Sequence, residues 1–183
     1  MKRVIVLRHA KSDWSDAALR DFDRSLNDRG HRAAAVMGRW AAHHGLTFDA
    51  IIASPAARVV DTLRHFREAY GACPEPAYDL RIYLAAGTTL AEVLAETREP
   101  ASSILLAGHS PGLEELILTA VPDDARSPLR DSVETKFPTA ALAVLDFDVT
   151  DWASLAHDFA GRATLRSFMR PRDLDPALGP DQR

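Results

Sequence analysis

The chain has 183 residues, which corresponds to about 1.2 domains at roughly 150 residues each, so a single domain is expected. An apolar fraction of 46% and a charged fraction of 26% are ordinary for a globular protein and exclude a disordered or collagen-like chain. The net charge of −4 argues against a surface devoted to nucleic acid, and the single cysteine, Cys73, excludes an internal disulfide. No apolar run approaches the ~18 residues of a membrane span or the core of a signal peptide, which predicts a cytoplasmic protein without a membrane partner.

Short apolar runs alternate along the chain with segments in which apolar residues recur at three- and four-residue spacing. The first pattern predicts buried strands, and the second predicts helices. The predicted strands lie at 4–7, 48–53, 77–80, 103–107, 141–147 and 155–162. The predicted helices lie at 27–45, 54–70, 88–97 and 113–120. We expect Ser54 to be the N-cap of the second helix, with Pro55 at its first helical position.

Strands that alternate with helices predict an α/β layer fold with a largely parallel sheet. The last two predicted strands have no helix between them, which predicts an antiparallel pairing at one edge of the sheet. We find no repeat and no linker that would divide the chain, so residues 1–170 are predicted to form a single domain. The tail, residues 171–183, is poor in apolar residues and is expected to be poorly ordered.

Arginine and histidine side chains follow three of the predicted strands at their carboxyl ends. Arg8 and His9 follow the first strand, Arg58 lies just after the second, and His109 follows the strand at 103–107. In parallel α/β sheets the ligand binds outside the carboxyl ends of the strands. We therefore expect these four side chains to meet at one rim of the sheet.

This set of side chains has the chemistry of a phosphate site. Two guanidinium groups placed together repel each other, and their planar donors fit phosphate or carboxylate oxygens two at a time. The neighbouring positive charges also make a nearby imidazole harder to protonate. A neutral His9 would keep a free lone pair, which makes it a candidate nucleophile.

Several motifs along the chain carry a resemblance to a known family. The stretch Leu7-Arg8-His9-Ala10-Lys11 resembles the Arg-His-Gly/Ala signature of the histidine phosphatase superfamily, and within it the small SixA-type phosphohistidine phosphatases. The other matching stretches, which follow in the same order, are residues 23–30 (DRSLNDRG), 54–62 (SPAARVVDT), 108–112 (GHSPG) and 137–142 (FPTAAL). The resemblance extends from about residue 2 to residue 152.

The resemblance implies a three-layer α/β/α sandwich and a chemistry that needs no metal and no cofactor. His9 corresponds to the nucleophile that is transiently phosphorylated, while Arg8, Arg58 and His109 correspond to the groups that hold the phosphoryl oxygens. The implied substrate is a phosphorylated one, with phosphohistidine in a protein as the leading class. A small-molecule phosphomonoester or acyl phosphate is the alternative.

Larger members of the superfamily supply a carboxylic acid, usually Glu, to protonate the leaving group, in a segment that matches residues 79–83. Here that segment contains Arg81 and no Glu, which favours substrates with good leaving groups. Substitute acids in the loop at 13–23 are Asp16, Asp21 and Asp23. The short interval between residues 80 and 88 leaves little room for a lid and predicts an open site, which suits a protein substrate.

Three other interpretations start from the same residues. Residues 108–112 also satisfy Gly-x-Ser-x-Gly, the elbow of serine hydrolases, but Pro111 lacks the N–H that the elbow needs and His157 would be the available base. A module that binds phosphate without cleaving it would need only Arg8, Arg58 and backbone amides. A metal site at His43-His44 is disfavoured because adjacent side chains diverge on a helix, and one at His9 and His109 is disfavoured because the neighbouring arginines oppose a cation.

Overall fold

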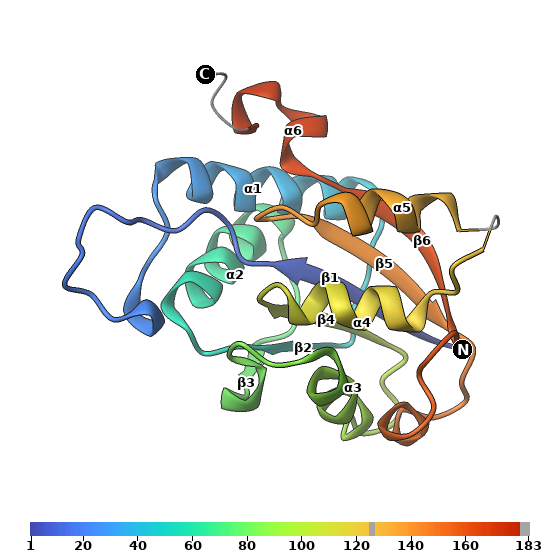
Figure 1. The fold of residues 1–183 in the computed structure, drawn as a ribbon. Coiled ribbons are helices and arrows are strands. Elements are labelled where there is room, and N and C mark those ends of the chain that lie inside the picture. Colours follow the sequence, from blue (N-terminus) through green and yellow to red (C-terminus); the bar gives the residue numbers. More distant parts are fainter. Residues whose placement is uncertain (125–126, 180–183) are drawn as a thin grey trace.

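A six-stranded sheet separates two layers of helices in the computed structural model, which describes residues 1–124 and 127–179 (Figure 1). The strands are β1 Lys2–Arg8, β2 Ala50–Ala53, β3 Pro76–Tyr78, β4 Ser103–Gly108, β5 Leu142–Phe147 and β6 Ala163–Met169. Their order in the sheet is β3-β2-β4-β1-β5-β6. The first four are parallel to one another, whereas β5 is antiparallel to both β1 and β6. The predicted α/β fold, with a mostly parallel sheet and antiparallel pairing at one edge, is confirmed.

The helices cover both faces of the sheet, as a three-layer sandwich requires. The helices are α1 Asp28–His43, α2 Ala57–Tyr70, α3 Gly87–Ala95, α4 Gly112–Ala120, α5 Pro128–Thr135 and α6 Pro171–Leu174. One face packs against α1 and α2, and the other against α3, α4 and α5 (Figure 1). At the contact between α1 and α2, a Cβ on Gly38 would collide with the backbone carbonyl of Phe66, so only glycine allows this close approach.

Two apolar clusters form the core, one on each side of the sheet. Successive side chains of β1 alternate between them: Val4 and Val6 belong to the cluster under α3 and α4, while Ile5 and Leu7 belong to the cluster under α1 and α2. All four side chains are at most 1% exposed. A strand that is covered on both faces needs apolar residues at every position, which explains the unbroken run Val4-Ile5-Val6-Leu7.

Two of the local predictions are wrong. Ser54 does not cap α2: the helix begins at Ala57, its N-cap is Ala56, and no side chain caps it. The last strand is not at 155–162 but at Ala163–Met169, after a 3-10 turn at Ala153–Ala156. The first half of β6 alternates buried and exposed side chains, as an edge strand does, and the 155–162 segment has no such alternation.

The helix α5 was not predicted from the sequence. Its eight residues bury one side chain, that of Val133, so the segment carries almost no apolar period to detect.

The segment after β6 is ordered where the structure describes it. Residues 171–179 form α6 and a 3-10 turn at Pro176–Leu178, and both pack against α1. Leu178 is buried in the cluster under α1, and Arg29 donates a hydrogen bond to the Gly179 carbonyl at 3.0 Å. Residues 180–183, the end of the predicted tail, lie outside the described residues. Within the described parts of the chain, the helices are too short or too polar to cross a bilayer.

Candidate active site

The register of the three central strands brings the predicted site residues to one end of the sheet. β4 lies between β2 and β1, and its residues Ala107 and Gly108 pair with Ala53 and Arg8 respectively. The next residues along the three chains, Ser54, His109 and His9, therefore emerge side by side. The His9 and His109 rings are tilted against each other with centroids 5.3 Å apart. This register brings the three segments together at the carboxyl ends of their strands, as expected.

Arg58 reaches the same place from the first turn of α2. Its Nη2 lies 3.3 Å from Nδ1 of His109, and the residue is 5% exposed. Thr62, one turn further along α2, fixes this geometry: its hydroxyl donates to the Arg58 carbonyl at 2.6 Å and accepts from the Ala10 amide at 2.9 Å. One buried hydroxyl thus ties the turn that carries Arg58 to the residue that follows His9.

The hydrogen bonds of His9 define its tautomer. Nδ1 lies 2.8 Å from the Ala10 carbonyl oxygen, which can only accept, so Nδ1 carries the proton. Burial lowers the pKa of His9 to about 3, and the positive charges of Arg58 and Arg8 contribute in the same direction. The imidazole is therefore neutral at pH 7, and Nε2 retains its lone pair. Nε2 has no hydrogen-bond partner among the residues that the structure describes.

His109 is neutral as well, with the opposite tautomer. The Arg58 guanidinium can only donate, so Nδ1 of His109 accepts, and its protonated Nε2 donates to the Ser54 hydroxyl at 2.8 Å. Burial and the charge of Arg58 lower the pKa of His109 to about 4. Ser54, which sequence reasoning assigned to a helix cap, instead orients this imidazole.

Arg8 completes the group of four. Its Nη1 donates to the Phe137 carbonyl at 2.6 Å, while its Nε is buried without a hydrogen-bond partner in the described structure. Burial lowers the pKa of Arg8, but a guanidinium remains charged at neutral pH. Arg58 is close enough to Arg8 for its charge to disfavour that of Arg8. The structure therefore places two cations and two neutral imidazoles at one end of the sheet, an arrangement that an oxyanion would stabilise.

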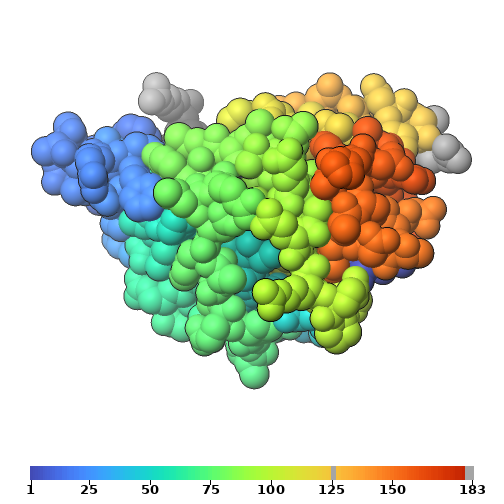
Figure 2. All heavy atoms as spheres, turned by 90° about the horizontal axis from the view of Figure 1, so that it is seen from below, coloured from blue at the N-terminus to red at the C-terminus, as the bar shows by residue number. Residues whose placement is uncertain are grey.

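Two further residues, Asp21 and Tyr83, lie over this group. Asp21 accepts from Arg58 at 2.7 Å through its backbone carbonyl and at 3.0 Å through Oδ2, and the Tyr83 hydroxyl donates to the same Oδ2 at 2.6 Å. The Tyr83 ring also stands edge-on to His109, with centroids 5.4 Å apart. Figure 2 shows the early loop, in blue, against the green surface formed by the residues after β3.

These contacts show a more covered site than expected. His9 and His109 are 9% and 3% exposed, the Tyr83 ring packs edge-on to His109, and Asp21 of the loop at 13–23 lies against Arg58. Tyr83 lies within the segment 79–83 that was searched for a glutamate, so a search for any side chain with a transferable proton would have found it. Hydrogen bonds with Tyr83 and Arg58 lower the pKa of Asp21, which keeps its carboxylate ionised.

The other candidate residues lie elsewhere or are engaged locally. Asp23 pairs with Arg20 at 2.7 Å, and Asp16 accepts from the Ala18 amide, so Asp21 alone of the three loop acids contacts a predicted site residue. The Ser110 hydroxyl is buried without a hydrogen-bond partner in the described structure, and His157 is an exposed residue that follows the 3-10 turn at 153–156. The hydrolase interpretation thus lacks a base for its serine.

The two histidines at the end of α1, His43 and His44, were expected to point apart and so not to share a ligand. His44 stacks on Trp40, with ring centroids 4.4 Å apart, and its Nδ1 lies 2.8 Å from the Trp40 carbonyl oxygen. The His43 ring stands edge-on to the His44 ring, with centroids 5.4 Å apart, so the two side chains do not diverge as expected. Nδ1 of His44 is engaged within its own helix.

Comparison with protein families identifies the class to which this fold and site belong. Residues 4–99, just over half of the chain, match the model of the histidine phosphatase superfamily, branch 1. The chain belongs to this family. It is also 32% identical over 167 residues to the uncharacterized protein Rv1276c of Mycobacterium tuberculosis, covering 91% of this chain and all of that one.

Solved structures narrow the likeness to one group within the family. The chain is similar to a protein assigned as the phosphohistidine phosphatase SixA of Agrobacterium tumefaciens, with 31% identity, coverage of 93% and 98% of the two chains, and a TM-score of 0.77. The same fold is found in a protein histidine phosphatase SixA in complex with tungstate, with 20% identity, coverage of 94% and 99%, and a TM-score of 0.75. The predicted resemblance to SixA-type proteins of this superfamily is confirmed.

Proposed function

We propose that this protein is a phosphatase that works through a phosphohistidine intermediate on His9 and needs no metal ion. The observation that carries the proposal is the hydrogen bond from Nδ1 of His9 to the Ala10 carbonyl, which leaves a lone pair on Nε2 beside Arg8 and Arg58. A neutral, oriented imidazole next to two permanent cations is suited to attack a phosphoryl group that those cations hold. The same cations oppose a bound metal ion at this place.

The reaction follows in two displacements. Nε2 of His9 forms a bond to phosphorus, and the bond from phosphorus to the leaving group breaks, with the bonding electrons staying on the leaving group. Water then forms a bond to phosphorus, the bond to Nε2 breaks, and phosphate is released with the lone pair returned to His9. Arg8 and Arg58 stabilise the charge on the phosphoryl oxygens in both steps, and removal of one such donor typically costs ~10²–10³ in kcat. His109 accepts from Arg58 and so positions its guanidinium.

The kind of leaving group that can depart from this site indicates the substrate class. Asp21, the acid nearest to Arg58, is ionised, so it has no proton to give to an alkoxide. A positioned acid contributes ~10²–10⁴ in rate, and its absence penalises alkoxide leaving groups most. Phosphoramidates and acyl phosphates leave more readily. Together with the likeness to SixA proteins, this supports phosphohistidine in a protein as the substrate class, with acyl phosphates and small phosphomonoesters as the alternative.

The intermediate can be captured directly. The protein is mixed briefly with a phosphohistidine-bearing protein labelled with ³²P, denatured without acid because phosphohistidine is acid-labile, and mapped by mass spectrometry. We expect label on His9, and no label and no turnover in the variant His9→Ala. Tight binding of phosphate without turnover or label would instead support a module that binds phosphate.

A side-by-side assay then ranks the substrates. Phosphohistidine protein, acyl phosphate and sugar phosphate are compared in the presence and absence of a chelator. We expect the first to have the highest kcat/KM and the chelator to have no effect. Preference for the sugar phosphate would move the assignment to a metabolite phosphatase, and a loss of activity that added metal reverses would contradict the proposed mechanism.

A further inference from the structure

A pocket with an unusual concentration of positive charge lies next to Arg8. It has a volume of about 270 Å³, and its walls come from the start of α1, the 136–139 segment and α6. Of the ten lining residues within 1–124 and 127–179, none is acidic and five are cationic: Arg8, Lys11, Arg29, Lys136 and Arg172. The chain as a whole has a net charge of −4, so this concentration of positive charge runs against the composition. We call it the basic pocket.

The lysines of the chain are concentrated at the basic pocket. The chain contains three lysines, and two of them, Lys11 and Lys136, line the basic pocket. Neither has a hydrogen-bond or ion-pair partner for its ammonium group within residues 1–124 and 127–179. The third, Lys2, is buried and paired with Glu99 at the other end of the sheet. Two ammonium groups without partners in one concave surface repel each other, and an anion that binds there relieves the repulsion.

The backbone that carries these cations is held in place. The Lys11 carbonyl accepts from the Asn27 amide at 3.0 Å, and Gly30 packs so closely on it that a Cβ there would collide. Two nearby carboxylates act on the arginines of the pocket: Glu114 is close enough to Arg8 to favour its charge, and Asp173, which pairs with Arg170, is close to Arg172. The two lysines, held on a fixed backbone, therefore remain the groups that are available to an anion.

Arg8 connects the basic pocket to the candidate active site. It lines the pocket, and its charge is also close enough to both imidazoles to disfavour their protonation. A pocket of this volume is smaller than the ~300–1,000 Å³ of sites that enclose a whole ligand, but it can take one anionic group of a larger molecule.

We infer that the basic pocket binds a second anionic group, a phosphate or a carboxylate, of the same substrate molecule whose phosphoryl group reacts at His9. The inference rests on the proposed function and adds to it a requirement on the substrate. Molecules with two anionic groups are bound more tightly than molecules with the reacting phosphoryl group alone.

Phosphonates, which are not hydrolysed, test this inference by equilibrium binding. Alkane bisphosphonates with spacers of two, four and six methylene groups are titrated by calorimetry against the matched alkyl monophosphonates. Several exposed ion pairs together account for roughly a tenfold change in Kd. We expect one spacer length to bind about tenfold more tightly than its monophosphonate, and this length measures the separation of the two anion sites.

Variants show where the additional affinity arises. We expect the double variant Lys11→Gln, Lys136→Gln to reduce the tenfold advantage to about twofold or less. The control is Arg39→Gln, which removes one charge from an exposed residue of α1 about 15 Å along the helix from Arg29, and which should keep the advantage. Thermal unfolding of each variant verifies that it is folded.

The outcomes separate this inference from the proposed function. Equal affinity for the two kinds of phosphonate at all spacers, or an advantage that the double variant retains, would overturn the inference while the monophosphonate still binds and His9 is still labelled. A lysine-dependent advantage for a dicarboxylate that lacks phosphorus would identify the pocket as a general anion site and would support it. Failure of any phosphonate to bind, together with no label on His9, would overturn both proposals.

Discussion

The two ends of the central sheet each contain a buried cation, and their surroundings are opposite. Lys2 begins β1 and Arg58 lies near the site where β1 ends, and each residue is 5% exposed. The ends of a seven-residue strand are about 20 Å apart. At one end the charge is fully satisfied by the fold, whereas at the other the fold concentrates charge that it does not neutralise.

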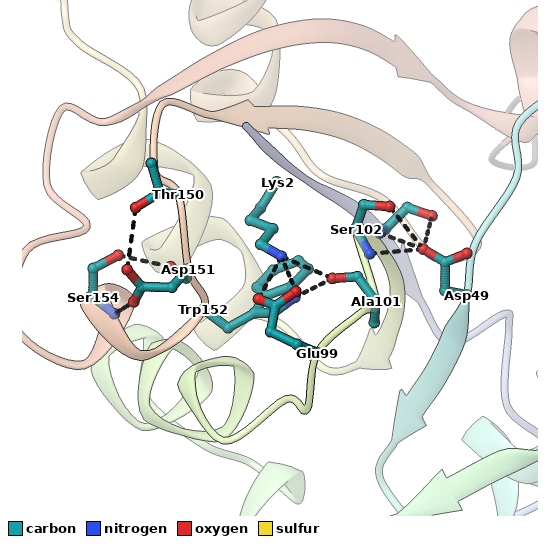
Figure 3. A network of polar contacts seen from close by, with 10 residues as sticks. Lys2, Asp49, Glu99, Ala101, Ser102, Thr150, Asp151, Trp152 and Ser154 are labelled. Carbon is teal, nitrogen blue, oxygen red and sulfur yellow. Dashed lines mark hydrogen bonds and ion pairs between the residues drawn. The ribbon is translucent and has the colours of Figure 1, made fainter.

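The end with Lys2 is a structural network (Figure 3). The Lys2 ammonium donates to both carboxylate oxygens of Glu99 and, at 3.0 Å, to the Ala101 carbonyl, so its three protons are all used. The Trp152 indole donates to the same carbonyl at 2.7 Å, and Asp49 accepts from the amides of the next two residues. These hydrogen bonds tie β1, β4 and the turn after β5 together.

The charged groups at the end with Arg58 are not paired in this way. Arg8 faces Arg58, and both imidazoles are held neutral. The half-exposed Asp21 pairs with Arg58, and Glu114 is close enough to Arg8 to favour its charge. Folding alone does not call for such an arrangement, because crowded like charges destabilise the chain that contains them. The difference between the two ends shows that a buried charge indicates a ligand-binding site when the fold does not neutralise it. The following predictions test this contrast.

Removal of the cation at the site end should affect activity far more than stability. In Arg58→Gln the phosphoryl oxygens lose a charged donor, and we expect kcat to fall by about 10²–10³. The free energy of unfolding should change little, because the variant also removes repulsion with Arg8. Steady-state kinetics and urea denaturation measure the two effects. If Arg58→Gln were strongly destabilised but retained its kcat, Arg58 would be a structural cation like Lys2, and the prediction would be wrong.

The matched change at the other end should do the reverse. Lys2→Met keeps the buried hydrocarbon but removes three hydrogen bonds, and we expect the free energy of unfolding to fall by about 1–2 kcal/mol. The figure is moderate because Glu99, with 57% of its side chain exposed, returns to water. We expect kcat/KM to stay within about twofold of the original. A tenfold loss of activity would show that the two ends are coupled.

The neutral imidazoles should make the site end sensitive to acid. Burial places the pKa of His9 at about 3 and that of His109 at about 4, against 6.5 for a free side chain. Between pH 7 and pH 5 the unfolded chain therefore takes up protons that the folded chain does not, and stability falls by about 1–2 kcal/mol for each imidazole. Urea denaturation at the two pH values measures this loss, which should be smaller in His9→Gln. An equal loss in both proteins would contradict the assigned neutral state.

The sequence predicted the strands of this site well because they are buried on both faces. Residues 4–7 and 103–107 are apolar at nearly every position, so their ends, and the side chains that follow, could be located without coordinates. The side chains that cover the site could not be found in this way. Asp21 and Tyr83 are 62 residues apart, and their hydrogen bond depends on where an irregular loop folds back, which no local periodicity records.

The errors elsewhere have the same physical origin. Ser54 has the chemistry of a helix cap, but a tertiary partner, His109, engages its hydroxyl. The tail after residue 170 has few apolar residues, yet one of them, Leu178, is buried against α1 and orders the segment before it. In both cases a single long-range contact outweighs a local pattern.

Asp21 provides the finest test of the contrast, since its carboxylate pairs directly with Arg58. If it acts as an internal anion that the substrate displaces, Asp21→Asn removes a competitor for Arg58 and should tighten binding of vanadate or tungstate by about three- to tenfold. If it instead donates a proton to the leaving group, the same variant should lower kcat for alkyl phosphates by ~10²–10⁴. The lowered pKa of Asp21 favours the first result. Tyr83→Phe is the matched control, because it frees the carboxylate from its hydroxyl partner without removing the charge, and it should leave oxyanion affinity near the original value.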